Sequence, residues 1–543
     1  GMVAGQASGD GRHYRNGRFD RRTRRGHPRL GSGPATRLLT AGIQGFVNRF
    51  RPELHVTAET GVLEAPAGAV RQGSNLHVFH QFRPTPDSGA RWAHQMATGL
   101  PYGWDVCDDV LAPEGDEVDC LAGSSVLVSD GTVELFFVTT TPSDGEAVRG
   151  SDLPHDRRGA RNFRIHRARI SDLDAISAEI SDDPSIVSRE VERLGPVEID
   201  DDDHPVTALV TPSVIRHDDG WLMIALDLVD ETAADIVVLT SDDRQHWTAL
   251  GSLEITGGST DTTVPRGRPF APRIVTMTDE LTDETSDVLF ITYPADDEGS
   301  SGGESAGYLV GTLSGTTFTV ETGFQLFDNG HDFTRPRVVQ GIQPVIVGLV
   351  GTFPGNGTGT WANCLSVPRF LTLRGGHLHQ DIVGVPSAVR SYTDRAAVFT
   401  AQLDVSRGAV TVSLLDEEDG LLATVRHSGD RIEVTRPTRD GVGDVRTAEL
   451  ADGDSDTLTI LVDGPVCEVF ADGGLVSLTS SLHGDAPFAK FRVDTTAGAR
   501  VLSAMESLGR RLQRRLAQLD NPEEQERLIA EAALADRDLA ADD

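Results

Sequence analysis

Residues 219–228, Asp-Gly-Trp-Leu-Met-Ile-Ala-Leu-Asp-Leu, contain the pattern that decides the fold class. The Asp-Gly pair tolerates positive φ and precedes an apolar run too short for a buried helix. A second run follows at Ile236–Thr240, and Ser241–Trp247 is typical of a segment that closes a hairpin. This stretch therefore predicts consecutive antiparallel strands.

The same combination of short apolar runs and Asp-Gly turns recurs from about residue 50 to residue 500. Further examples are Leu76–Phe82, Val133–Thr140 and Val288–Tyr293. Such regular spacing predicts an all-β chain of propellers, sandwiches or barrels rather than βαβ units. The pattern breaks around residues 376–395, and the strands beyond it are typical of a sandwich.

The two ends of the chain differ from this body. Residues 1–36 carry eight arginines and two acids, which predicts a disordered basic arm (1–40) or a start codon placed too early. After residue 503, Asn521-Pro522-Glu523-Glu524 offers a helix cap. A leucine stripe precedes that cap, at Leu508, Leu512, Leu516 and Leu519. We expect a helical tail over 503–543, packed on the body or used in association.

Charge excludes one class of function. The 543 residues contain 49 Lys+Arg against 83 Asp+Glu, a net charge of −34, and Lys490 is the only lysine. A general nucleic-acid binder needs a positive surface, so that function is excluded. The acidic, lysine-poor composition favours a high-salt cytoplasm, where surface acids are screened, over an acidic protein of moderate salt.

Cysteines and targeting signals add little. The four cysteines show no Cys-x-x-Cys spacing, which favours buried free thiols over zinc or a disulfide. No apolar run is long enough for a membrane span. The arginines of 20–25 resemble a twin-arginine export signal, but the polar stretch after them favours the cytoplasm over export.

Six motifs, in order, resemble those of glycoside hydrolase family 32, the family of invertases, levanases and inulinases. The first blade of that family resembles His55–Gly68 followed by His77–Pro84. The other similar elements are Arg91–His94, Leu121–Ser124, Asp328–Phe333, Leu365–Leu373 and Glu468–Gly473. The resemblance covers about residues 50–485. It implies a five-bladed propeller, which we place at 45–380, followed by a β-sandwich at 385–502.

The resemblance also implies three carboxylates. Retaining hydrolysis uses a nucleophile and an acid/base about 5 Å apart, and the family adds an Asp that stabilises the transition state. The matching positions here are Ala65, Thr211 and Phe270, beside Pro66, Pro212 and Pro272 in register. None of the three side chains ionises as an acid, so we expect no catalytic residue at these positions. Loss of a nucleophile alone typically costs on the order of 10⁴–10⁶ in rate.

Other positions match sugar-contacting residues of the family or lie beside them. Each also has an ordinary structural explanation: packing for an aromatic ring, or a turn for Ser and Asp. Glu64 adds a carboxylate beside the nucleophile position, although a regular strand would point it to the opposite face from Ala65. The candidate substrate-binding residues are Glu64, Gln81, Trp92, Ser124, Phe270 and Asp332.

No metal or other cofactor is predicted. His77 and His80 are three apart on a strand and face opposite sides, so with His94 they do not complete a metal site. The acidic runs Asp200–Asp203 and Asp416–Asp419 lack the Gly and final Glu of a calcium loop and fit a solvated surface.

Three functional hypotheses remain. The favoured one is a catalytically silent relative whose propeller funnel binds a carbohydrate. The alternative is an active glycoside hydrolase or transferase, acting on fructosides or related glycans, with relocated carboxylates drawn from Glu64, Asp332, Asp108, Asp109 and Asp119. The third is a scaffold that works through its sandwich and helical tail. The ligand and the oligomeric state stay open.

Overall fold

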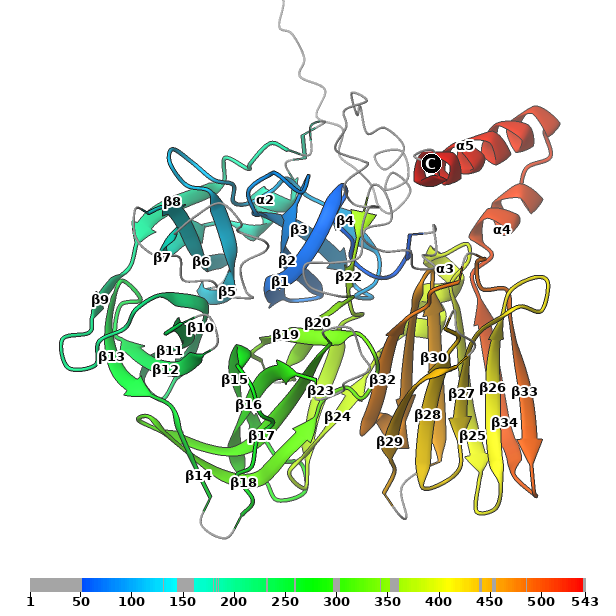
Figure 1. Cartoon of the computed structure of the whole chain (residues 1–543). Coiled ribbons are helices and arrows are strands. Elements are labelled where there is room, and N and C mark those ends of the chain that lie inside the picture. The colour runs from blue at the N-terminus through cyan, green and yellow to red at the C-terminus, as the bar shows by residue number, and fades with distance from the viewer. Residues whose placement is uncertain are drawn as a thin grey trace, which may run out of the picture.

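The computed structural model is built almost entirely from β-strands (Figure 1). It describes residues 51–540 apart from 130, 144–160, 179, 182, 184, 231–232, 258–259, 296–302, 342, 352–360, 439–441, 452–455 and 485, with side chains described as far as residue 531. The predicted basic arm lies outside the described residues. The all-β prediction, a propeller followed by a sandwich, is confirmed.

Five mainly antiparallel sheets surround a common axis as the blades of a propeller (Figure 1). In each blade the first long strand is innermost, and these strands pack against one another around the ring. The innermost strands are β1 (Gly61–Gln72), β5 (Asp119–Ser129), β10 (Leu209–His217), β15 (Phe270–Thr278) and β19 (Phe333–Val339).

The remaining strands complete the blades outwards. The first blade adds β2 (Asn75–Arg83), β3 (Arg91–Thr98) and β4 (Trp104–Val106). The second blade adds β6 (Thr132–Pro142), β7 (Arg161–Ile170) and β8 (Val191–Pro196). The third blade adds β9 (Glu198–Asp200), β11 (Gly220–Leu228), β12 (Ala234–Ser241) and β13 (His246–Ser252). The fourth blade adds β14 (Glu254–Thr256), β16 (Thr285–Pro294), β17 (Glu304–Ser314) and β18 (Thr317–Leu326). The fifth adds β20 (Val345–Val350), β22 (Cys364–Leu365), β23 (Arg369–Arg374) and β24 (His377–Asp381), while β21 (Trp361–Ala362) pairs in parallel with β1. Because β21 lies between β20 and β22 of the fifth blade in the chain, this pairing fastens the last blade to the first.

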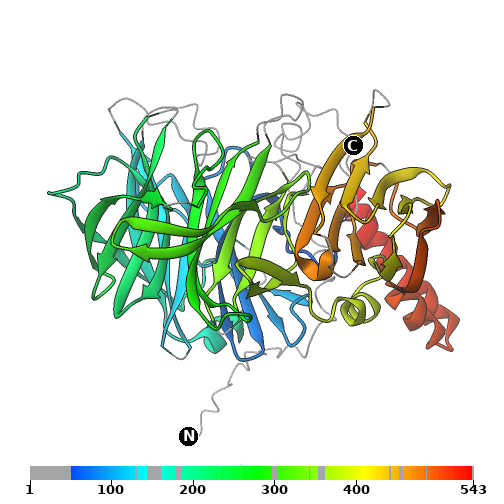
Figure 2. The same cartoon turned by 90° about the horizontal axis from the view of Figure 1, so that it is seen from below.

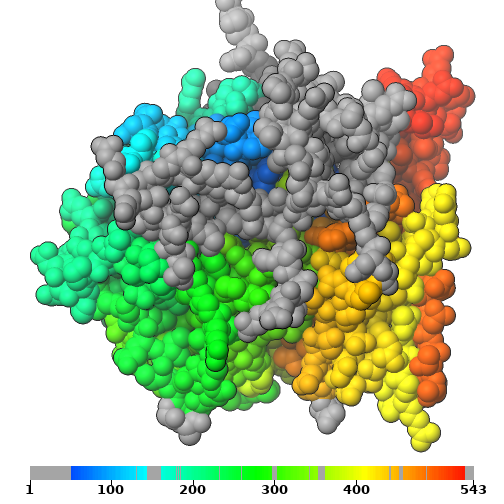
Figure 3. Space-filling view, viewed as in Figure 1, coloured from blue at the N-terminus to red at the C-terminus, as the bar shows by residue number. Residues whose placement is uncertain are grey.

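Two five-stranded sheets form the sandwich beside the propeller (Figures 2 and 3). An aliphatic core fills the space between them. One sheet contains β25 (Ala397–Asp404), β30 (Thr457–Asp463), β31 (Val466–Ala471), β32 (Val476–Ser481) and β34 (Arg500–Leu508). The other contains β26 (Ala409–Leu415), β27 (Leu421–His427), β28 (Arg431–Arg436), β29 (Asp444–Glu449) and β33 (Lys490–Thr496).

Helices are short and few among the described residues. They are α2 (Leu173–Ala178), α3 (Val385–Tyr392), α4 (Arg511–Ala517) and α5 (Pro522–Ala540). The predicted start of the tail at residue 503 is wrong, because Ser503–Leu508 belong to β34 and pair with β25. Leu508 therefore lies in a strand rather than in the helical stripe. No helix in the described part of the chain is long and apolar enough to cross a membrane.

A buried polar interface joins propeller and sandwich. Arg369 on β23 donates to Asp328 at 3.1 Å and lies 3.5 Å from Glu468 on β31, and all three side chains are fully buried. His55, which precedes β1, contacts both Asp463 and Glu468 of the sandwich. Buried charges are tolerated when they are paired in this way, so the interface depends on matched ionic groups.

Candidate functional site

Each innermost strand contains a β-bulge near its start, at the level of the predicted catalytic positions. The pairing register shifts between Leu63 and Ala65 in β1, and the same irregularity occurs in β5, β10, β15 and β19. Thr211, Ala271 and Arg335 adopt φ values of 50°, 43° and 47° there, which non-glycine residues rarely adopt. Bulges re-aim side chains, and all five blades share this irregularity near the start of their innermost strands.

Two arginines, Arg273 and Arg337, lie beside Thr211. Arg273 donates to Thr211 Oγ1 at 2.8 Å and to the carbonyl oxygens of Thr211 and Gly123, each at 2.9 Å. Arg337 donates to the same Gly123 oxygen at 3.0 Å. The contacts connect β15 and β19 with β5 and β10 across the ring. Where the resemblance implies a transition-state-stabilising acid, the structure therefore has a threonine hydroxyl beside guanidinium groups.

Sequence reasoning missed these arginines. The available signal was the repeated Pro-Arg pair, Pro272-Arg273 and Pro336-Arg337, which falls after the bulge in two adjacent blades.

Phe270 lies between two more arginines. It is 5% exposed, and the guanidinium carbons of Arg335 and Arg268 lie 4.6 and 5.5 Å from its ring centroid. Arg335 also binds Glu304 at 2.6 Å. Burial raises the pKa of Glu304, but the nearby arginine outweighs burial and lowers it overall. Phe270 thus packs in a cationic setting with an ionised carboxylate nearby.

The bulge in β1 corrects the expected orientation of Glu64. Its carboxylate accepts from Gln81 Nε2 at 3.0 Å, although Gln81 is the cross-strand partner of Ala65. Glu64 therefore reaches the same side of the sheet as Gln81 and does not follow the alternation of a regular strand. Arg83 binds Glu64 at 3.0 Å and Asp119 at 2.9 Å. Burial raises the pKa of Glu64 against the opposing effect of Arg83.

Trp92, Ser124 and Gln81 connect neighbouring strands and blades. The indole N–H of fully buried Trp92 donates to the Leu121 carbonyl at 3.1 Å. Ser124 Oγ accepts from the Val214 N–H at 3.0 Å, and Gln81 Oε1 accepts from the Ala122 N–H at 2.6 Å. Three of the residues at sugar-contact positions thus have their polar groups bonded within the protein.

Asp332 lies at the contact with the sandwich. Its carboxylate accepts from Arg436 at 2.8 Å and from the Ser481 N–H at 2.7 Å. Burial raises the pKa of Asp332, but Arg436 and neighbouring groups lower it overall. The structure therefore brings Asp332 together with Arg436 and Ser481 of the sandwich.

The loop acids proposed as relocated catalysts also have partners. Asp108 accepts from Ser181, and Asp119 accepts from the Ala90 N–H and from Thr140. Asp109 binds Arg91 at 2.9 Å, yet burial raises its pKa to about 8. Burial therefore opposes ionisation of Asp109 even beside Arg91.

The three histidines of the first blade lie on two paired strands, His77 and His80 on β2 and His94 on β3. His77 and His80 belong to different networks: His77 Nδ1 lies 3.0 Å from His94 Nε2, and His80 contacts Gln95. Burial lowers the pKa of His77 to about 4 and that of His80 to about 3. The described histidines and acids here do not gather into a metal-binding group.

A cavity of about 470 Å³ opens at the opposite end of the third blade, lined by residues that include His217, Trp221 and His246. Thr211 lies near the start of β10 and His217 at its end, about 20 Å apart at the rise of a strand. The cavity contains none of the predicted site residues.

Comparison with known proteins shows a family resemblance. The model of the Glycosyl hydrolases family 32 N-terminal domain matches residues 177–381. The chain is therefore similar to glycoside hydrolase family 32. Among curated relatives of this family, the sucrose-6-phosphate hydrolase of Bacillus subtilis is 24% identical over 402 residues, which span 71% of this chain and 75% of that protein.

Solved structures of family 32 proteins share the fold. The sucrose-6-phosphate hydrolase of Lactobacillus gasseri superposes with a TM-score of 0.65 at 17% identity, over 90% of this chain and 99% of that one. The family 32 beta-fructofuranosidase of Bombyx mori gives 0.63 at 19% identity, over 85% and 94%, and a variant of it was solved in complex with sucrose.

Proposed function

We propose that this chain is a family 32 protein that lacks ordinary β-fructosidase activity and binds a carbohydrate through its propeller funnel. Supporting evidence comes first from the three catalytic positions, where Ala65, Thr211 and Phe270 carry no carboxylate. The carbohydrate is proposed from relatives of the same fold, one of which was solved with sucrose.

The contact of Arg273 with Thr211 carries the proposal. Hydrolysis of a glycoside passes through an oxocarbenium-like, positively charged transition state. A carboxylate would stabilise that charge, whereas a guanidinium 2.8 Å from the Thr211 hydroxyl repels it. The funnel floor therefore opposes the charge that an active enzyme has to stabilise.

Relocated carboxylates are the competing explanation, and Glu64 is the strongest of them. Its raised pKa suits a general acid. However, the side chain is 1% exposed, and Gln81 and Arg83 both hold its oxygens. Glu64 would have to break its bonds with Gln81 and Arg83 before it could reach a substrate. We therefore favour the catalytically silent relative.

Hydrolysis is tested on the full chain in about 2 M salt, where surface acids are screened. Sucrose, sucrose 6-phosphate and inulin are incubated with the protein, and released reducing sugar is compared with a heat-killed control. We expect no release above the control. Steady release above the control would contradict the proposal, and its disappearance in Glu64→Gln would establish relocated catalysis by that residue.

Binding is tested separately by titrating sucrose and fructose into the same preparation by calorimetry. We expect saturable heat without product, weakened roughly tenfold in Phe270→Leu by loss of the aromatic face. Phe137→Leu, a buried ring of the second blade, is the matched control and should bind as the parent does. Absence of saturable heat for both sugars would contradict the binding half of the proposal.

A further inference from the structure

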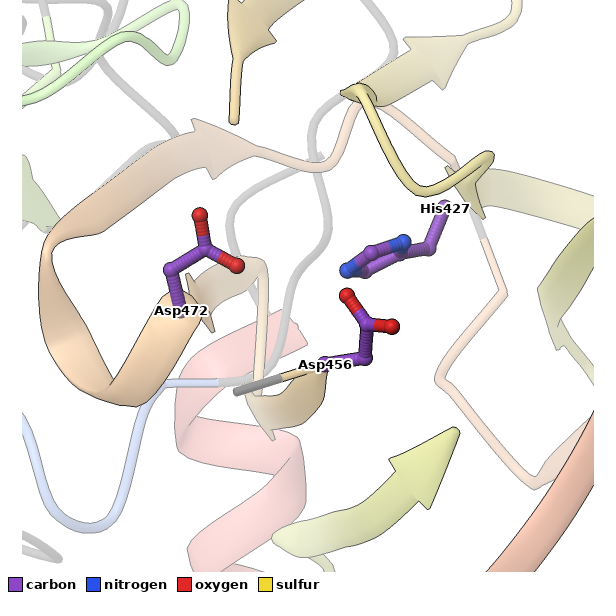
Figure 4. Close-up of side chains that lie close together, drawn as sticks. All are labelled: His427, Asp456 and Asp472. Carbon is purple, nitrogen blue, oxygen red and sulfur yellow. The ribbon is translucent and has the colours of Figure 1, made fainter. Parts of the chain in front are cut away.

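A second cluster of polar side chains lies in the sandwich, remote from the funnel. His427 ends β27 in one sheet, whereas Asp456 precedes β30 and Asp472 follows β31 in the other. One ligand atom from each residue lies within 4.8 Å of the others. Figure 4 shows the His427 ring directed toward the two carboxylates.

The imidazole is the observation that points to a ligand. His427 is 0% exposed, and within the described part of the chain its Nε2 has no hydrogen-bond partner. A buried polar nitrogen without a partner is costly.

We propose that His427, Asp456 and Asp472 form a site for a divalent transition-metal ion that ties the two sheets of the sandwich together. One imidazole nitrogen with two carboxylates is a donor set that suits zinc and its neighbours better than calcium, which prefers six to eight oxygens. Three protein ligands leave a further position for water. The inference is independent of what the funnel binds.

The turn after β27 sets a condition on binding. The Gly429 N–H donates to His427 Nδ1 at 3.1 Å, which places the proton of the neutral ring on Nε2. A metal on Nε2 displaces that proton, so Nδ1 becomes the N–H and the Gly429 amide turns away. Gly429 has a φ of 89° and is a glycine, so its backbone has the freedom for this rotation.

The ligand atoms must also draw together. Zinc binds nitrogen and oxygen at about 2.0–2.2 Å, so atoms spread over as much as 4.8 Å need to approach one another. Asp456 is only partly buried and lies before the strand rather than within it. Its side chain is therefore the member best able to move.

The experiment is a calorimetric titration of Zn²⁺ into the full metal-stripped chain, with thermal unfolding measured in parallel. We expect one saturable site per chain and a higher melting temperature with zinc. Asp456→Asn should weaken zinc roughly tenfold or more and abolish the thermal shift. Asp430→Asn removes an exposed aspartate three residues from His427 and is the matched control.

Equal zinc affinity in the two variants would overturn the proposal, as would saturable binding of Ca²⁺ in place of Zn²⁺. A readout on the parent chain covers the case in which Asp456→Asn does not fold. With histidine-selective labelling, zinc should shift the His427 ring signals and speed exchange of the Gly429 amide. Zinc saturation that leaves both unchanged excludes His427 as a ligand.

Discussion

Stability at alkaline pH should depend on one buried histidine, His55. Its Nδ1 lies 2.7 Å from Asp463 and its Nε2 3.2 Å from Glu468, and all three side chains are fully buried. Burial by itself lowers the pKa of His55, but hydrogen bonds to Asp463 and Glu468 outweigh it and raise the pKa to about 9. The cation joins the segment before β1 to the sandwich.

The sign follows from the two protonation states. The folded chain holds the His55 proton up to about pH 9, whereas the unfolded chain releases it near 6.5. The contribution of protonated His55 to the free energy of unfolding is therefore fully present below pH 6.5 and is lost as pH rises through 9. Across that interval the linkage amounts to about 3 kcal/mol of unfolding free energy. Because the pair is buried, molar salt should screen it little.

The measurement is urea unfolding between pH 6.5 and 10 in about 2 M NaCl, followed by tryptophan fluorescence. Trp104 is a local reporter because its indole N–H donates to the Leu54 carbonyl at 2.8 Å. His55→Gln should be less stable than the parent at pH 6.5, and the difference should shrink as pH rises. His246→Gln is the control, since His246 is exposed beside Asp243. A His55→Gln chain that loses stability with pH as steeply as the parent would refute the reasoning.

Three further outcomes are expected. His77 and His80 have folded-state pKa values of about 4 and about 3, so their contribution is present above pH 6.5 and is lost as pH falls toward 4. His80→Leu should therefore flatten the acid limb of the urea unfolding profile, and an unchanged limb contradicts this. Asp332→Asn should cost about 2 kcal/mol in urea unfolding by weakening the bond to Arg436, while sucrose binding stays as in the parent; a selective loss of binding would return Asp332 to the sugar site. Truncation after residue 509 leaves β34 intact, and sedimentation of that chain against the full one tests association through the tail. Fewer protomers per assembly are expected if α4 and α5 pair protomers, and an unchanged number of protomers rules out that role.

Short-range patterns predicted most of the architecture. Asp219-Gly220 and the apolar run after it lie at a hairpin between β10 and β11, because turn chemistry and side-chain alternation are local properties of the chain. The residues at the positions that the family motifs singled out, Ala65, Thr211 and Phe270, lie on three of the innermost strands. The predicted orientation of Glu64 was wrong because the alternation of side chains between two faces assumes a regular strand. The register shift before Ala65 is a property of strand pairing, which the local sequence does not show.

From the sequence alone one could deduce an all-β chain in two parts and predict that Ala65, Thr211 and Phe270 occupy the family's catalytic positions. Only the tertiary structure decided which groups meet across long separations: Arg273 with Thr211, Asp332 with Arg436, and His427 with Asp456 and Asp472. These contacts arise between blades, between domains or between sheets. Local sequence patterns contain no information about such contacts, because the packing of the blades and sheets determines them.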